Sequence, residues 1–443
     1  MHASIQNLSS PKMKIYKLIQ KHGVKILYIA TIASLGASFF GSVLNSRLLS
    51  KESFGDWKYL QSFIALVSYF ANFGLYSSGG RLIAATNDKE KVRIYKGYLL
   101  YFAMIGLSII TLSSIITGFF FPKLLNETLF HLALIMFPFF IIHPLNFYFE
   151  TTFQGEGKMI SLAIFRCVPP LTYVAILYAF ESLSTGSIYY NAVLYYASYF
   201  VTFMILLWYD KPIFKWNTSE WKDLRLQHKS FGIHLYWGAL SSMGAMYLLP
   251  ILVGFFNINN VEVGHYSLAL SFIMPLSFLP SIVGTSYYKK YIKLKVIPSE
   301  AFKKVVISSI FLLIVLLLGI DYIIDFFLGP KYKEVSALIK IGSFGAVLHG
   351  LADFINKFLL AKGESIYLKK VSIVIGIVQL TSSLLLIHYF SATGAIIAKS
   401  LGSLVFFGSL FYYYYKKYLI QKSEGIKIVL TDELKSDQEI IIE

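Results

Sequence analysis

Long apolar runs follow one another along most of the chain, separated by short polar stretches. Each run is close to the twenty residues that an α-helix needs to cross the hydrocarbon core of a membrane. The runs are continuous rather than alternating, so they predict helices and not the strands of a membrane barrel. We expect about twelve spans, at residues 24–48, 59–80, 97–120, 129–150, 160–181, 188–208, 232–256, 265–287, 304–328, 335–360, 369–389 and 393–415.

Composition supports this prediction of an all-α membrane protein. Hydrophobic residues make up 56% of the 443 residues and charged residues only 14%, which is too apolar for a water-soluble protein of this length. The first apolar run is too long for the hydrophobic part of a cleaved signal peptide, so we expect it to be a mature helix. The chain has one cysteine, Cys167, which excludes an intrachain disulfide and a thiolate metal cluster.

Lysine and arginine are distributed unevenly among the predicted loops. With the N-terminus in the cytoplasm, 32 of the 40 Lys and Arg residues belong to predicted cytoplasmic segments. Such an asymmetry predicts that both termini are cytoplasmic and that the number of spans is even. The net charge of +16 then reflects topology and attraction to anionic lipid, and it does not indicate nucleic-acid binding.

An internal repeat gives the predicted organisation of the spans. Residues 55–63 (GDWKYLQSF) are similar to residues 264–272 (GHYSLALSF), at an offset of 209. Two six-helix halves would both enter the membrane in the same direction, as parallel repeats around a central cleft. The predicted segments are a cytoplasmic N-terminal segment (1–23), an N-terminal half (24–208), a cytoplasmic linker (209–231), a C-terminal half (232–415) and a cytoplasmic tail (416–443).

Several short motifs resemble those of a known transporter family. Residues 47–55 (RLLSKESFG) resemble the R-L-L-G-P-E-E-Y-G turn after the first helix of the polysaccharide flippases, which belong to the multidrug/oligosaccharidyl-lipid/polysaccharide exporter superfamily. The difference is Ser-Lys in place of Gly-Pro. Further segments that resemble this family, in the expected order, are 260–266 (NVEVGHY), 327–332 (FLGPKY), 359–364 (LLAKGE) and 392–398 (ATGAIIA).

The resemblance implies a function and a location. It implies transfer of an undecaprenyl-pyrophosphate-linked oligosaccharide from the cytoplasmic to the outer leaflet of a bacterial inner membrane, for a surface polysaccharide such as O-antigen. It also implies alternating access without a cofactor, and action beside glycosyltransferases and a polysaccharide polymerase. An ion-coupled exporter of small molecules from the same superfamily is the alternative transporter.

A pyrophosphate substrate requires cationic side chains within or beside the spans, where a charge is costly unless it faces a cavity or a partner. The candidates for substrate binding are Arg47, Arg81, Lys340, Lys357 and Lys399. Each also has a structural interpretation. Arg47, Lys340 and Lys399 could extend toward the headgroups, and Arg81 could anchor the cytoplasmic end of its helix. Lys357 stands four residues after Asp353, on the same helix face, so the two could form an ion pair.

Carboxylates inside a membrane are the groups that could couple transport to protons. Glu150 and Asp353 are the candidates for ion coupling. Related flippases often carry an acidic residue in the middle of the seventh helix, whereas this chain has the apolar segment 246–250 (MYLLP) there. The identity of the coupling site therefore cannot be transferred from the family.

Enzymatic function is less consistent with the sequence. The chain has no phosphate-binding loop of the type G-x-x-x-x-G-K-[ST], and neither a H-E-x-x-H motif nor paired Cys and His residues with zinc-ligand spacing. The predicted outer loops are short, which does not favour a membrane glycosyltransferase. The remaining enzyme candidate is His349 within an apolar helix, which faintly resembles the catalytic region of membrane-bound O-acyltransferases. The sequence therefore predicts a transporter that needs neither a metal nor a cofactor.

Overall fold

The computed structural model describes residues 11–179 and 186–420, and within these ranges the regular structure is helical. Parts of the predicted N-terminal segment and of the predicted tail therefore lie outside the described residues. The elements are α1 (Pro11–Leu48), α2 (Lys51–Phe70), α3 (Leu75–Ala85), α4 (Lys89–Phe120), α5 (Glu127–Met136), η1 (Phe137–Ile141), α6 (Ile142–Gly155), α7 (Met159–Ala179), α8 (Ile188–Asp210), α9 (Thr218–Gln227), η3 (His228–Gly232), α10 (Ile233–Phe256), α11 (Val261–Lys293), α12 (Ser299–Phe327), η4 (Pro330–Tyr332), α13 (Glu334–Ala361), α14 (Ser365–Tyr414) and η5 (Tyr415–Ile420).

The helices agree with the predicted spans at most positions. Nine helices among the described residues are long and apolar enough to cross a membrane. The longest, Ile366–Ile420, covers the last two predicted spans, which are separated by a non-helical residue, Ser391, with φ 48°. Two of the twelve predicted spans do not correspond to a single helix that meets the criteria of length and hydropathy. The span 59–80 coincides with α2 and α3, and the span 232–256 coincides with α10. The all-α membrane architecture is confirmed, whereas the repeat of two six-helix halves stays a prediction.

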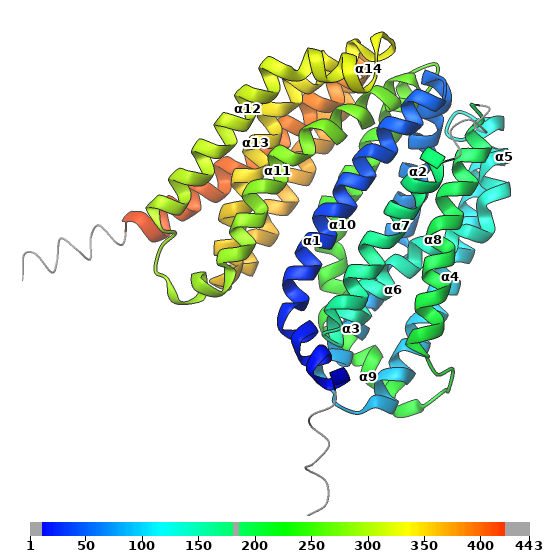
Figure 1. Ribbon diagram of the computed structural model, residues 1–443, viewed down its shortest axis with the longest axis vertical. Coiled ribbons are helices and arrows are strands. Elements are labelled where there is room, and N and C mark those ends of the chain that lie inside the picture. The colour runs from blue at the N-terminus through cyan, green and yellow to red at the C-terminus, as the bar shows by residue number, and fades with distance from the viewer. Residues whose placement is uncertain (1–10, 180–185, 421–443) are drawn as a thin grey trace, which may run out of the picture. The chain divides into compact units, whose positions relative to one another are not determined.

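The chain separates into two compact units, Met1–Gly264 and His265–Glu443. The division falls within the first turn of α11, so α10 belongs to the N-terminal unit. In that unit α1 packs along α7, α2 packs against α10, and α7 packs against α8 (Figure 1). Because α2 also contacts α1 and α8, the four helices α1, α2, α7 and α8 form the framework in which the candidate site lies.

The motif at residues 47–55 determines where α2 begins and how it packs. The Ser50 hydroxyl accepts a hydrogen bond from the Ser53 amide at 3.0 Å and caps the helix N-terminus. At Gly55 any Cβ would lie 1.8 Å from the Asn260 carbonyl oxygen, so only glycine allows this close approach. Asn260 Nδ2 also donates to Asp56 Oδ1 at 2.7 Å. The motif therefore fixes the first turn of α2 against the turn that precedes α11.

The predicted span 59–80 is interrupted between α2 and α3. Phe73 and Gly74 both have positive φ values, 50° and 74°. The Tyr236 hydroxyl donates to the carbonyl oxygen of Phe70 at 3.0 Å, which satisfies one of the carbonyl groups left free at the end of α2. The continuous apolar run did not reveal this interruption, because Phe73 is itself apolar.

In the C-terminal unit, α13 packs along both α12 and α14 (Figure 1). The face of α13 that includes Ile339, Phe354 and Phe358 is buried. In contrast, α12 presents large side chains such as Phe311 and Leu318 outward. A helix with exposed large apolar side chains over its whole length is typical of a surface solvated by lipid rather than water.

Candidate functional site

A small pocket lies within the N-terminal unit, between α1, α2, α7 and α8, with a volume of about 150 Å³. Four of its lining residues are aromatic: Trp57, Tyr173, Tyr195 and Tyr199. Its polar lining residues are Ser38, Ser42, Asn45, Gln61 and Lys58. Aromatic walls with a few convergent polar groups are the usual composition of a ligand-binding site.

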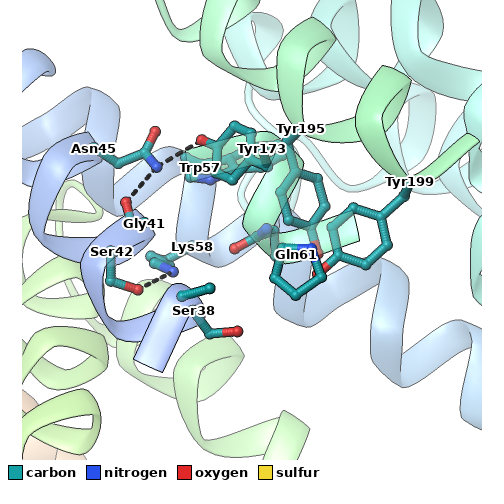
Figure 2. Close-up of a pocket in the computed structure, with 12 residues that line it drawn as sticks. Ser38, Gly41, Ser42, Asn45, Trp57, Lys58, Gln61, Tyr173, Tyr195 and Tyr199 are labelled. Atoms are coloured by element: carbon teal, nitrogen blue, oxygen red, sulfur yellow. Dashed lines mark hydrogen bonds between the residues drawn. The ribbon is translucent and has the colours of Figure 1, made fainter. Parts of the chain in front are cut away.

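Lys58 is the charged residue of the pocket lining. Its Nζ donates to the Ser42 hydroxyl at 3.1 Å (Figure 2). The same Nζ lies 5.6 Å from the centroid of the Phe54 ring. An ammonium group has three N–H donors, and Ser42 accepts only one of them. No carboxylate of the described residues lies within ion-pair distance of Lys58. A cation in this position is suited to bind an anionic group of a ligand.

Buried hydrogen bonds fix the side chains that line the pocket beside Lys58. Asn45 Nδ2 donates to the Tyr173 hydroxyl at 2.6 Å (Figure 2). Asn191 Nδ2 donates to Asn45 Oδ1 at 3.0 Å. Both asparagines are buried, so these bonds satisfy amide groups that would otherwise lose hydration. The Tyr195 ring lies 4.7 Å from that of Tyr199 and 5.3 Å from that of Trp57. The pocket is thus lined by aromatic rings whose positions are fixed by α2, α7 and α8.

Two of the predicted substrate-binding residues lie in the N-terminal unit but do not line this pocket. Arg47 is exposed in the last turn of α1, two residues after Asn45. Arg81 is exposed on α3, with its guanidinium carbon 4.5 Å from the centroid of the Phe231 ring. This distance is typical of a cation–π contact, which holds α3 against η3.

The predicted cations of the C-terminal unit differ in their partners. Lys340 Nζ lies 2.7 Å from Asp321 Oδ2, and Lys357 Nζ lies 3.4 Å from Asp353 Oδ2. The ion pair that the four-residue spacing predicted on α13 is therefore present. Lys399, on α14, is half-buried, and no carboxylate of the described residues lies within ion-pair distance of it.

Both candidates for ion coupling are held by neighbouring groups. Glu150, on α6, forms an ion pair with Arg166 of α7, whose Nε lies 3.1 Å from Glu150 Oε2. Asp353 accepts hydrogen bonds from the Ser281 hydroxyl and, at 3.1 Å, from Asn356 Nδ2. The two carboxylates lie in different units and are each neutralised by one cation. Their role in coupling stays a prediction.

A second charged cluster joins the ends of α4, α6, α7 and α8. Lys96 is 1% exposed and lies 2.5 Å from Glu156 Oε2 and 2.6 Å from Asp210 Oδ1. The Tyr148 hydroxyl donates to the other oxygen of Asp210 at 2.7 Å. Burial by itself would lower the pKa of Lys158, but the hydrogen bonds and charges of Glu156 and Asp210 outweigh burial and raise this pKa. The cluster has two cations and two anions, so it is electrically balanced.

The sequence does not single out Lys58, because the predicted second span begins at residue 59 and leaves Lys58 in the loop before it. The structure places it in the second turn of α2. Ser50 was the signal that could have corrected this, since a serine before a helical pattern favours a helix start at the next residue. Lys58 and Gln61, three residues apart on one helix face, would then have appeared as a polar patch within a span.

Comparisons with known proteins agree with this architecture. The structure of "Lipid II flippase MurJ, inward closed conformation" matches with a TM-score of 0.71 and 14% identity, covering 92% of each chain. An inward-facing multidrug resistance MATE family transporter of the MOP superfamily matches with a TM-score of 0.67 and 16% identity, covering 90% of this chain and 99% of the transporter.

A MOP superfamily transporter from Pyrococcus furiosus, whose title states a "reverse polarity of binding pocket", matches with a TM-score of 0.58 and 15% identity, over 89% of this chain and 96% of that chain. At these identities the likeness concerns the fold. A search of curated protein sequences gives no match. The family profile described as "Polysaccharide biosynthesis protein" matches residues 21–288, which is more than half of the sequence. This multi-pass membrane protein therefore belongs to the polysaccharide biosynthesis protein family.

Proposed function

We propose that this protein is a flippase that moves an undecaprenyl-pyrophosphate-linked oligosaccharide from the cytoplasmic to the outer leaflet of a bacterial inner membrane. In this proposal both termini are cytoplasmic and transport proceeds by alternating access. The glycan contributes to a surface polysaccharide of the O-antigen type, and glycosyltransferases and a polymerase act before and after the flippase.

The observation that carries the proposal is the environment of Lys58. A half-buried cation whose described surroundings include a hydroxyl but no carboxylate lines a pocket inside the N-terminal unit. The pocket combines this cation with amide, hydroxyl and aromatic side chains, which are the groups that contact sugars and phosphates. Family membership supports the same class of substrate.

The alternative transporter, an exporter of small molecules, is supported by the aromatic walls and by the fold shared with MATE transporters. The charge of the pocket argues against the export of cationic compounds, because Lys58 would repel them without a compensating carboxylate among the described lining residues. We therefore favour an anionic, lipid-linked substrate over a cationic soluble one.

The test is a strain deleted for this gene, with analysis of surface glycan and of undecaprenyl-linked oligosaccharide in lipid extracts. We expect loss of surface polymer and accumulation of the lipid-linked oligosaccharide on the cytoplasmic leaflet. Normal surface glycan with altered drug sensitivity would instead support the exporter. Normal surface polymer with altered acylation would indicate chemistry at His349.

Ion coupling is a separate part of the proposal and concerns Glu150 and Asp353. Reconstituted protein is given a fluorescent lipid-linked oligosaccharide, with and without a pH gradient across the vesicle membrane. If Asp353 carries the coupling proton, Asp353→Asn abolishes the effect of the gradient, while Glu150→Gln retains it. The reverse pattern assigns coupling to Glu150, and an unchanged effect in both variants rejects both residues.

A further inference from the structure

Four large aromatic side chains lie exposed within nine residues at the end of α8 and just after it. They are Trp208, Tyr209, Phe214 and Trp216, of which Trp208 is 78% exposed and Phe214 72% exposed. Such a density of exposed aromatic rings is unusual on a surface that faces water. It is typical of the headgroup level of a membrane, where amphipathic rings are favoured.

The backbone that carries these rings is held rigidly against α4. The amide of Ile213 donates to the carbonyl oxygen of Arg93 at 3.0 Å, and Arg93 Nε donates to the carbonyl oxygen of Lys211 at 2.8 Å. At Gly97 any Cβ would lie 2.0 Å from the Ile213 carbonyl oxygen, so the absence of a side chain permits this contact. The segment is therefore prearranged rather than free to reorient.

The far end of the same segment is held by aromatic and polar contacts. The Tyr98 hydroxyl donates to the carbonyl oxygen of Asn217 at 2.8 Å and accepts from the Asn217 amide at 2.8 Å. The Trp216 ring lies 5.0 Å from the Trp221 ring of α9 and 5.7 Å from the Tyr98 ring. The aromatic surface is thus continuous with α9 and has a fixed shape.

The net charge of this surface is positive, because the exposed carboxylate of Glu90 pairs with Lys215 at 3.7 Å and not with Arg93 or Lys211. Arg93 and Lys211 are exposed, and no carboxylate of the described residues lies within ion-pair distance of either. Arg93 uses its Nε in the bond to Lys211, so both terminal nitrogens of its guanidinium remain available to a phosphate. The adjacent Asp210 is buried and engaged by Lys96, so it does not neutralise the surface.

We propose that Arg93, Lys211 and the four exposed aromatic side chains form a binding site for the phosphate headgroup of an acidic glycerophospholipid. The rings lie at the boundary between headgroups and acyl chains, and the two cations contact the phosphate. This site is separate from the pocket at Lys58 and would anchor the end of α8 and α9 to one leaflet, which is the cytoplasmic one in the predicted topology.

The experiment is a titration of the full-length protein in neutral detergent with short-chain phosphatidylglycerol, followed by tryptophan fluorescence, with phosphatidylcholine as the uncharged comparison. We expect saturable binding of phosphatidylglycerol and an apparent affinity that falls about fivefold for each cation removed, in Arg93→Gln and Lys211→Gln. The charge-conserving variant Lys211→Arg should bind like the wild type.

The matched control removes the same charge elsewhere, in the variant Lys303→Gln/Lys304→Gln, because both lysines are exposed and both lie at the predicted cytoplasmic end of the span 304–328. Equal loss of binding in this control would overturn the proposal, since it would indicate non-specific attraction. Unchanged binding in Arg93→Gln/Lys211→Gln would also overturn it. Tighter binding of undecaprenyl pyrophosphate at the same residues would assign the surface to the substrate instead. Melting temperatures without added lipid report whether each variant is folded.

Discussion

Two lysines of the N-terminal unit, Lys58 and Lys96, have opposite surroundings. Lys96 is almost fully buried and lies within 2.6 Å of both Glu156 and Asp210. Lys58 is half-buried and has the hydroxyl of Ser42 as its hydrogen-bond acceptor in the pocket. One cation is neutralised by the protein itself, whereas the other lines a pocket and has no carboxylate among the described residues within ion-pair distance.

The difference shows that the presence of a cation in a membrane segment does not by itself indicate substrate binding. A buried ion pair is mainly a structural element, and removal of one partner leaves an uncompensated charge. A cation beside a polar pocket without a carboxylate is instead suited to an external anion. Loss of Lys96 should therefore reduce stability, whereas loss of Lys58 should reduce transport and leave stability almost unchanged.

The largest expected effect is on folding, in Lys96→Met. This substitution leaves Glu156 and Asp210 close together with the partly exposed Lys158 as the remaining cation of the cluster, so we expect a loss of about 3 kcal/mol of stability. The measurement is thermal unfolding of the purified protein in detergent. The double variant Lys96→Met/Asp210→Asn should recover part of the loss. A melting temperature equal to that of the wild type would contradict the structural role of the cluster.

The next effect concerns transport, in Lys58→Met. We expect the rate of flipping to fall about tenfold or more, because a charge-assisted hydrogen bond to the substrate is lost. The melting temperature should stay close to that of the wild type. The variant Lys58→Arg should retain most of the rate, and Lys51→Met, which removes a cation from the same helix outside the pocket, is the matched control. Equal rates in Lys58→Met and wild type would reject the site.

A smaller effect is expected from pH at Glu364, which lies between α13 and α14. Burial opposes its ionisation, but hydrogen bonds from Lys417, Tyr418 and Tyr413 outweigh burial and hold the pKa of Glu364 below the ordinary value of 4.5. A lowered pKa in the folded state stabilises the protein above pH 4.5, and this contribution is lost as the pH falls through the folded-state pKa. Melting temperatures measured from pH 7 downward should show a steeper decline in the wild type than in Glu364→Gln. Parallel curves would show that ionised Glu364 does not contribute to the stability of the folded state.

The smallest effect is expected in Lys340→Gln. The pair of Lys340 with Asp321 is largely exposed, so its loss should change stability by less than about 1 kcal/mol. Thermal unfolding and the flipping assay measure the two consequences separately. A large loss of flipping with unchanged stability would show that Lys340 contacts the substrate, as the sequence suggested, and that its pairing with Asp321 is not its main role.

Much of the fold could be predicted because membrane helices have a strong local signal. Over the described residues, ten of the twelve predicted spans coincide with helices that are long and apolar enough to cross a membrane, including both spans of the kinked helix around Ser391. The interruption between α2 and α3 could not be predicted. It depends on positive φ values at Phe73 and Gly74 and on a hydrogen bond from Tyr236, which lies more than 160 residues away.

The candidate site was harder to predict from the sequence than the fold. Arg47 lies in the last turn of α1, as predicted, whereas α3 continues for four residues beyond Arg81, and neither residue lines the pocket. Lys357 was correctly paired with Asp353, because a spacing of four residues fixes a shared helix face. Lys58 was missed because the predicted second span began at residue 59, although α2 begins at Lys51. Its bond to Ser42 of α1 could not have been predicted, because that bond depends on the packing of two helices.

The sequence by itself determined the class of protein and the approximate positions of most helices, and Ser50 in the motif at residues 47–55 caps the start of α2. These properties arise from hydropathy and capping, which act over a few neighbouring residues. The tertiary structure alone decided which charges are neutralised: Lys96 meets Asp210 across 114 residues, whereas Lys58 meets a hydroxyl. Charge compensation depends on distances between helices, and only their packing sets those distances.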